Sequence, residues 1–299
     1  MRPSLRSRNS AGVVLNTGTD CRRVAIVVNP AKDHEPLRGR IREKLEGDGF
    51  SVSLFHVPLG EQPDAPGQAP GTVEFVISLG GDGTLLYTAR LCYGLEVPVI
   101  AVNLGTFGFL TEVSREEVFS AIDSLVAGDA LLQRRIMLEV EVERDGGPLG
   151  RWHCLNAAVI GRGDVTRLLS LETFINDSYL CTYRADGVIV STPTGSTGYS
   201  LSAGGPILMP QLESLILNPI CPHTLSSRPV ILSASDEVRI RVAGSGACPH
   251  LSIDVQEGTG LLPGDQVRIR KAPKAFLLVM SKKRSFFQVM REKLGWVDN

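Results

Sequence analysis

A change of periodicity near residue 131 constrains the fold of this chain more than any other feature of its sequence. Up to about residue 130, short apolar stretches alternate with longer, charged stretches of helical period. Such alternation predicts a parallel sheet with helices on both faces. We expect the strands of this sheet at residues 24–28, 51–57, 75–79 and 97–102, with helices between them.

Beyond residue 131 the sequence has the pattern of strands. Stretches of strand length alternate apolar and polar residues, and turn residues separate them. This pattern predicts a mostly antiparallel β domain. We therefore expect a loose tail at 1–21, an α/β domain at 22–130, a β-rich domain at 131–276, and a terminal helix at 277–299 that returns to the first domain.

The composition is typical of a soluble globular protein. Of the 299 residues, 43% are hydrophobic and 21% are charged, and the length suffices for two cores. The net charge of −1 argues against a nucleic-acid partner, because sequence-blind binders are basic. The first residues lack the apolar core of a secretory signal, and no stretch reaches the roughly 18 apolar residues of a membrane helix. We expect a cytoplasmic protein without a membrane partner.

Cysteine and histidine positions give no indication of a metal centre. The 6 cysteines include no C-x-x-C pair, and the 5 histidines show no H-E-x-x-H spacing. We expect buried free thiols in a reducing compartment. The sequence names no metal ligand.

The stretch FVISLGGDGTLL at 75–86 runs from an apolar strand through a glycine turn into a helix. The N–H groups of such a turn and the helix dipole attract anions. We therefore expect Gly80, Gly81, Gly83 and Thr84 to bind phosphate, with Thr84 capping the helix. The turn is not a Walker A loop, because the chain contains no Gly-Lys dipeptide.

Asp82 is the unusual residue of this turn. An ionised carboxylate only accepts hydrogen bonds, so phosphates repel it unless a cation or a hydroxyl donor lies between. A phosphate site with an acceptor aimed at a hydroxyl fits phosphoryl transfer, in which an aspartate takes the proton of the attacking hydroxyl. The alternative is a plain tight turn. A specified GGDGT arises by chance about once in 10⁶ positions at average residue frequencies, which favours the functional interpretation.

Two other loops admit both a structural and a functional interpretation. NLGTFGFL (103–110) is either a loop that admits a base or a βα loop whose Phe107 and Phe109 anchor the core. STPTGSTGYSLS (191–202) is dense in hydroxyl groups, which suit a loop tip or a wall that contacts ribose and phosphate. Tyr199 offers a ring face in the second case.

Three single residues are similarly ambiguous. Asn156 lies inside the apolar stretch CLNAAVI, where its amide needs partners. It is either a satisfied residue at a strand end or a ligand contact. Arg167 and Arg184 are either surface arginines or bidentate phosphate contacts.

In chain order, GGDGT, NLGTFGFL, DGVIVSTPTGSTGYSLSAGGPI (186–207) and PICPHTLSSRPVIL (219–232) resemble the NAD kinase family. The terminal FFQVMREKLGW is similar to the last helix of that family, and the resemblance runs from about residue 22 to residue 297. GGDGT alone is shared with diacylglycerol and sphingosine kinases. The later blocks are far more specific to the NAD kinase family.

This resemblance implies a fold and a reaction. The fold is a Rossmann-like α/β amino-terminal domain followed by a sandwich-like, all-β carboxy-terminal domain. The reaction transfers the γ-phosphoryl group of ATP, with a divalent metal such as Mg²⁺, to the 2′-hydroxyl of the adenosine ribose of NAD, giving NADP. A cytoplasmic homo-oligomer, a dimer or a tetramer, is also implied. A preference between NAD and NADH, and between ATP and polyphosphate, is not fixed by the sequence.

The resemblance also implies site residues in this chain. Asp82 would be the catalytic base and, with Gly83, a dinucleotide contact. The further NAD-binding positions implied are Phe107, Asn156, Ala157, Arg167, Arg184, Asp186, Thr197, Gly198, Tyr199, Ser200, Leu201, Ser202 and Gln256.

Three positions depart from the family pattern. Ala157 stands where an acid follows the asparagine, Val255 replaces a glycine before Gln256, and Gly198 replaces an alanine. The first two motivate one alternative, a catalytically weak dinucleotide-binding regulator. The shared GGDGT motivates another, a lipid kinase, which would need an apolar groove or a membrane-facing surface. The intact Asp82 argues against the regulator.

Overall fold

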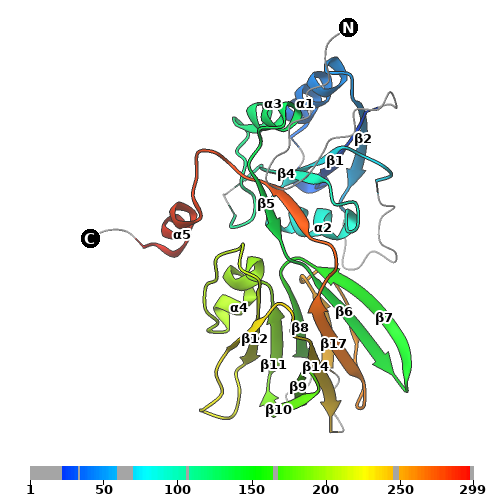
Figure 1. The fold of residues 1–299 in the computed structure, drawn as a ribbon, viewed down its shortest axis with the longest axis vertical. Helices are drawn as coiled ribbons and strands as arrows, with labels where there is room; N and C mark the ends of the chain where they lie inside the picture. Colours follow the sequence, from blue (N-terminus) through cyan, green and yellow to red (C-terminus); the bar gives the residue numbers. More distant parts are fainter. Residues whose placement is uncertain are drawn as a thin grey trace. The chain divides into compact units, whose positions relative to one another are not determined.

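The computed structural model describes residues 22–32, 34–58, 70–105, 108–163, 168–244 and 249–296 (Figure 1). The chain divides into two compact units. The first ends at Arg134 and resumes at Phe276, and the second is Arg135–Ala275. In these ranges, no helix has the length and the apolar character needed to cross a bilayer.

A six-stranded sheet with the order β2-β1-β3-β4-β18-β5 forms the centre of the first unit. The neighbouring pairs from β2 to β18 are parallel. Strands β3 and β4 are buried at every residue, as expected for strands covered on both faces. The strands are β1 (Arg23–Val28), β2 (Ser51–His56), β3 (Phe75–Gly80), β4 (Pro98–Asn103), β5 (Leu132–Arg135) and β18 (Phe276–Val279).

Helices cover both faces of this sheet (Figure 1). The apolar sides of α1 (Glu35–Gly47) and α3 (Val118–Ala127) share one core with β1, β3 and β4. Helix α2 (Asp82–Leu91) packs on the other face, where the Thr88 hydroxyl donates to Ser78 Oγ at 3.0 Å. The short 3-10 helix η1 (Pro30–Lys32) follows β1.

The second unit consists of two six-stranded antiparallel sheets, with the orders β10-β9-β14-β17-β6-β7 and β13-β12-β11-β8-β15-β16. Buried side chains of both sheets form one apolar cluster, so the unit is a β-sandwich. The elements are β6 (Leu138–Arg144), β7 (Gly147–Cys154), β8 (Ala157–Arg162), β9 (Leu169–Ile175), β10 (Ser178–Ala185), β11 (Gly187–Ser191), η2 (Thr194–Thr197), α4 (Tyr199–Ser202), β12 (Ser214–Ile220), β13 (Val230–Ser233), β14 (Val238–Ala243), β15 (Pro249–Ile253), β16 (Glu257–Gly260) and β17 (Gln266–Lys271).

The predicted fold class, an α/β domain with a parallel sheet followed by a β-sandwich, is confirmed. Two short strands differ from the prediction. Strand β5 was expected within the β-rich domain and β18 within a terminal helix, yet both extend the first sheet. All four residues of β18 are buried, which suits an inner strand and not a one-sided surface helix. Helix α5 (Phe286–Leu294) begins later, at a capping box of Ser285 and Gln288.

The sandwich core supplies a direct test of this architecture. Leu138 is fully buried in the cluster, whereas Leu225 is 92% exposed. We expect Leu138→Ala to lower the free energy of unfolding by about 2–5 kcal/mol through lost burial and a cavity. Leu225→Ala, the matched control, should change it by less than about 0.5 kcal/mol. Urea denaturation followed by the fluorescence of Trp152, which packs on this core, measures both. Equal effects would contradict the assigned core.

Candidate active site

The glycine turn joins β3 directly to α2. Gly80 is the last residue of β3, Gly81 is the N-cap of α2, and Asp82 is the first helical residue. A Cβ on Gly80 would lie 2.2 Å from Oγ1 of Thr84. Only glycine therefore lets the strand end and the first helical turn approach this closely.

The prediction that Thr84 caps α2 is wrong. The helix begins at Asp82, so Thr84 already lies inside its first turn, and the cap Gly81 makes no side-chain hydrogen bond. Thr84 is 3% exposed, and its side chain packs against Gly80. This placement favours a packing role for Thr84 over a contact with phosphate.

The turn lies where α/β sheets of this kind bind ligands. Strand β2 flanks β1 on one side and β3 flanks it on the other, so the strand order reverses between β1 and β3. Ligands bind outside the carboxyl ends of the strands at such a switch point. A Cβ built on Gly81 would meet no atom within 4 Å, so the backbone there is open to a close approach.

The two carboxylate oxygens of Asp82 accept hydrogen bonds from the loop that follows β4. Oδ2 accepts from the N–H of Phe109 at 3.0 Å. Oδ1 accepts from the N–H groups of Leu110 and Thr111, each at 3.2 Å, and from the Thr111 hydroxyl at 3.3 Å. Among the described residues, Oδ2 thus accepts one hydrogen bond and keeps a free lone pair, whereas Oδ1 accepts three.

Asp82 also explains a glycine of that loop. A Cβ on Gly108 would lie 1.9 Å from Oδ1 of Asp82, so any larger residue would displace the carboxylate. Asn103, at the end of β4, fixes the same loop: its Nδ2 donates to Thr111 Oγ1 at 3.0 Å, and its Oδ1 accepts from the N–H of Gly105 at 2.7 Å. The roles of Asn103 and Thr111 were not predicted from the sequence, because a hydrogen-bonded loop leaves no periodic pattern.

In the second unit, Asp254 holds the segment that carries Asn156. Its carboxylate accepts from the N–H groups of Leu155 and Asn156 at 2.9 Å and of Ala157 at 3.0 Å. Asp254 is 3% exposed, so these charge-assisted bonds are shielded from water. The role of Asp254 was not predicted from the sequence, although an acid placed directly after an apolar strand is itself an unusual feature.

Several hydroxyl groups of residues 191–202 bond within the protein. The Thr192 hydroxyl donates to the carbonyl oxygen of Leu155 at 2.6 Å, and it accepts from the N–H of Gly195 at 3.1 Å. Much of the polar density that was predicted as a ligand wall therefore stabilises the loop itself. The side chains bonded in this way are Ser191, Thr192, Ser196 and Ser200.

Besides Oδ1 of Asn218, whose Nδ2 donates to the carbonyl oxygen of Ser200, two buried side-chain oxygens in this region have no hydrogen-bond partner among the described residues: Oδ1 of Asn156 and Oγ1 of Thr194. They lie on adjoining segments, because a Cβ on Gly195 would be only 2.3 Å from the carbonyl oxygen of Asn156. Unpaired buried oxygens are costly, so these two are positions for a polar ligand or an ordered water. Asn156 was a candidate from the sequence, and Thr194 by itself was not.

The remaining predicted residues differ in exposure. Asp186 forms an ion pair with Arg162 at 3.1 Å, and Ala157 packs in a small apolar cluster with Val159 and Ile189. The exposed side chains are Arg184, Tyr199 and Ser202, and the partly exposed residues are Thr197, Gly198, Leu201 and Gln256. Phe107 and Arg167 lie outside the described residues.

Val255 occupies a strained backbone conformation. Asp254 and Val255, in the turn between β15 and β16, have φ angles of 50° and 58°. A β-branched residue rarely adopts this left-handed region, which favours glycine. Val255 is also 78% exposed, so packing does not offset the strain. The strain adjoins the carboxylate that holds the Asn156 segment.

No set of three or more histidine, cysteine, aspartate or glutamate side chains gathers as a metal site within the described ranges. The carboxylate nearest the glycine turn, that of Asp82, is already bonded to four donor groups. A hard divalent cation such as Mg²⁺ commonly keeps several waters and binds through substrate phosphates.

Comparison with known proteins gives consistent matches along the chain. The model of the ATP-NAD kinase N-terminal domain matches residues 53–130, and that of the C-terminal domain matches residues 155–281. The NAD kinase of Citrifermentans bemidjiense is 46% identical over 279 residues, covering 89% of this chain and 96% of the relative. The NAD kinase of Geobacter metallireducens is 45% identical over 238 residues, covering 80% and 84%.

Solved structures are also similar. The structure of yeast NADH kinase complexed with NADH superposes with a TM-score of 0.82 at 26% identity, covering 94% of this chain and 89% of that one. An NAD kinase from Archaeoglobus fulgidus in complex with ATP gives a TM-score of 0.70 at 24% identity, covering 92% and 100%. At the latter identity the likeness is one of fold.

The strain at Val255 can be tested by substitution. We expect Val255→Gly to raise the free energy of unfolding by about 1 kcal/mol, because relief of the left-handed strain exceeds the entropic cost of glycine. The same change at Val230, half-buried in β13, should lower it by a similar amount. Thermal or urea denaturation measures both variants. Destabilisation by Val255→Gly would show that the turn is not strained.

Proposed function

Because the chain belongs to the NAD kinase family, we propose that it transfers the γ-phosphoryl group of ATP to the 2′-hydroxyl of the adenosine ribose of NAD, giving NADP. The observation that carries this assignment is the match of both domain models, together with 46% identity to an NAD kinase across 89% of the chain. The glycine turn and the Asn156 region lie inside the matched segments. The enzyme is thus a phosphotransferase with an alcohol acceptor.

Asp82 acts as the general base in this reaction. Phosphoryl transfer needs positioning and charge stabilisation more than covalent chemistry, so a fixed acceptor for the hydroxyl proton suffices. Oδ2 takes that proton, because it keeps a lone pair, whereas Oδ1 is engaged by Leu110 and Thr111. The loop donors keep the carboxylate oriented.

The second unit binds the dinucleotide. Asn156 Oδ1 and Thr194 Oγ1, both buried and unpaired among the described residues, are acceptors for polar hydrogens of NAD. The exposed ring of Tyr199 offers a stacking face. Ala157 removes the acid that the family pattern places beside Asn156, so affinity rests more on the remaining contacts. The other assigned contacts are Gly83, Phe107, Arg167, Arg184, Asp186, Thr197, Gly198, Ser200, Leu201, Ser202 and Gln256.

Gly80, Gly81 and Gly83 bind the donor phosphates through their backbone at the positive end of α2. A divalent metal such as Mg²⁺, brought by the triphosphate of ATP, would neutralise charge on the transferred group. The chain works in the cytoplasm as a homo-oligomer, a dimer or a tetramer. Sedimentation of the purified protein tests the last point.

The two alternatives make different predictions. A lipid kinase would share GGDGT, but the domain matches beyond that turn, at residues 155–281, favour a dinucleotide acceptor. A catalytically weak regulator would bind NAD without forming product. No observation on the described residues favours either alternative over the kinase.

We expect the purified protein to form NADP from NAD, ATP and Mg²⁺, measured with a dehydrogenase specific for NADP. Excess chelator should abolish product, because the phosphoryl charge needs the cation, and added Mg²⁺ should restore it. Binding of NAD by calorimetry without NADP formation would support the regulator instead. Undiminished turnover in excess chelator would exclude the metal from the proposal.

The role of Asp82 is tested by Asp82→Asn. Asparagine cannot accept the hydroxyl proton, so kcat should fall at least about 10²-fold, while NAD binding measured by calorimetry persists. Asp129→Asn is the matched control, since Asp129 is an exposed aspartate of the same unit. Its kcat should stay within about twofold of the wild type, as expected for a surface position. A variant at position 82 that keeps most of its kcat would exclude Asp82 as the base.

A further inference from the structure

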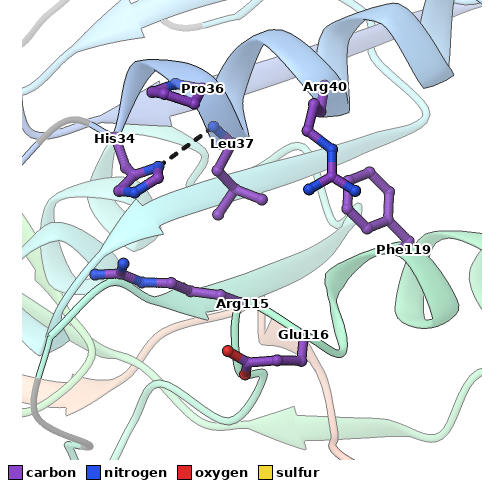
Figure 2. Close-up of a pocket in the computed structure, with 7 residues that line it drawn as sticks. All are labelled: His34, Pro36, Leu37, Arg40, Arg115, Glu116 and Phe119. Carbon is purple, nitrogen blue, oxygen red and sulfur yellow. Dashed lines mark hydrogen bonds between the residues drawn. The ribbon is translucent and has the colours of Figure 1, made fainter.

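A cavity of about 300 Å³ opens in the first unit, between α1 and the start of α3 (Figure 2). Its volume is at the lower end of the roughly 300–1,000 Å³ of small-molecule sites. None of the sequence motifs described above includes a residue that lines it. The lining residues are His34, Pro36, Leu37, Arg40, Arg115, Glu116 and Phe119.

Arg40 differs from the other basic residues of α1, because no described carboxylate pairs with it. Its guanidinium lies over the ring of Phe119, 4.9 Å from the ring centroid. The remaining bases of the helix all have acidic partners within 4 Å. These pairs are Arg38 with Glu35, Arg42 with Glu46, and Lys44 with Asp48 and Asp123. Arg40 thus presents an unneutralised, planar cation to the cavity.

Arg115 brings a second guanidinium to the cavity and connects it to the glycine turn. Its guanidinium donates to the carbonyl oxygen of Leu104. The N–H of Leu104 in turn donates to the carbonyl oxygen of Gly80 at 3.0 Å. Leu104 is therefore the one residue between Arg115, which lines the cavity, and Gly80, which belongs to the turn that carries Asp82.

His34 supplies a third donor. Its Nδ1 accepts from the N–H of Leu37 at 3.3 Å, so in the neutral ring the hydrogen is on Nε2. In Figure 2, His34 and Arg115 lie on one side of the cavity, and Arg40 with Phe119 lies on the other. The donors are thus spread along the cavity and not focused on one point.

Glu116 is the acid of the lining. The hydrogen bond from Ser114 and, to a lesser degree, the charges of Arg115 and Lys283 lower the pKa of Glu116, which stays ionised. One carboxylate against two guanidinium groups leaves the cavity with excess positive charge. It suits an elongated anion with several acceptor oxygens.

We propose that this cavity extends the phosphate site of the glycine turn and binds the remainder of a linear phosphate chain, as carried by the donor nucleotide of the proposed NAD kinase reaction. The spread of donors fits successive phosphates better than a single phosphate. Arg40 contributes a two-pronged contact, held in place by the ring of Phe119. The hydrogen bonds through Leu104 connect this binding to the turn of Asp82.

The direct test is calorimetric titration of the full chain with inorganic tripolyphosphate at constant ionic strength. The wild type should bind it, and Arg40→Gln should bind at least about tenfold more weakly, which corresponds to about 1.4 kcal/mol. Arg42→Gln is the matched control, because Arg42 is on the same helix, pairs with Glu46 and lies outside the cavity. It should bind within about twofold of the wild type. Circular dichroism confirms that each variant is folded.

The source of the phosphate chain is separated by steady-state kinetics. If the nucleotide supplies it, Arg40→Gln raises the KM for ATP and not for NAD, and tripolyphosphate competes with ATP. If tripolyphosphate binds through Arg40 without competing, the cavity holds a free polyphosphate. Equal binding by the wild type and Arg40→Gln, or no binding, overturns the site. Since the titration needs no turnover, a chain that forms no NADP would overturn the proposed function and leave this result intact.

Discussion

The carboxylate of Asp82 is the interaction on which the first unit's site depends. It joins the end of β3 to the loop after β4 through four hydrogen bonds, three of them to backbone N–H groups. Oδ1 accepts three of these bonds and Oδ2 accepts one, so the two oxygens have different roles. Oδ1 fixes the loop, and Oδ2 retains the capacity to accept a proton. Glycine at position 108 follows from the same contact, because a Cβ there would lie 1.9 Å from Oδ1 of Asp82, whereas glycine at position 80 makes room for Thr84.

The second unit uses the same physical device. Asp254 accepts three backbone N–H groups and so orders the segment that presents Asn156. In both units a carboxylate orders a loop by accepting hydrogen bonds from its backbone N–H groups. The loop needs this support because it lacks the regular hydrogen bonds of a helix or a sheet, and ligand-binding residues commonly lie on such loops. The positive φ angles of Asp254 and Val255 show that the backbone is strained to place this group. Ordered loops of this kind pre-organise a site before its ligand arrives.

Periodicity predicted the elements that bury long apolar runs, such as β3, β4 and the helices between the strands, because burial determines residue type there. It failed for β5 and β18, which are four residues long and pair with strands remote in sequence. GGDGT was found because its composition is improbable. The internal bonds of the hydroxyl-rich loop could not be predicted, since composition does not show that Ser196 and Ser200 bond within the protein. The roles of Thr194 and Asp254 can be found only from the structure, by identifying the hydrogen-bond partners of buried polar atoms.

The claim that Asp82 divides its two oxygens between structure and proton transfer can be measured in one experiment. A crystal structure of the protein with bound NAD gives the distance from Oδ2 of Asp82 to the 2′-oxygen of the adenosine ribose. We expect about 2.6–3.2 Å, with the Leu110 and Thr111 contacts to Oδ1 unchanged. A 2′-oxygen beyond about 4 Å from Oδ2, or one that reaches Oδ1 after those contacts break, would contradict the account.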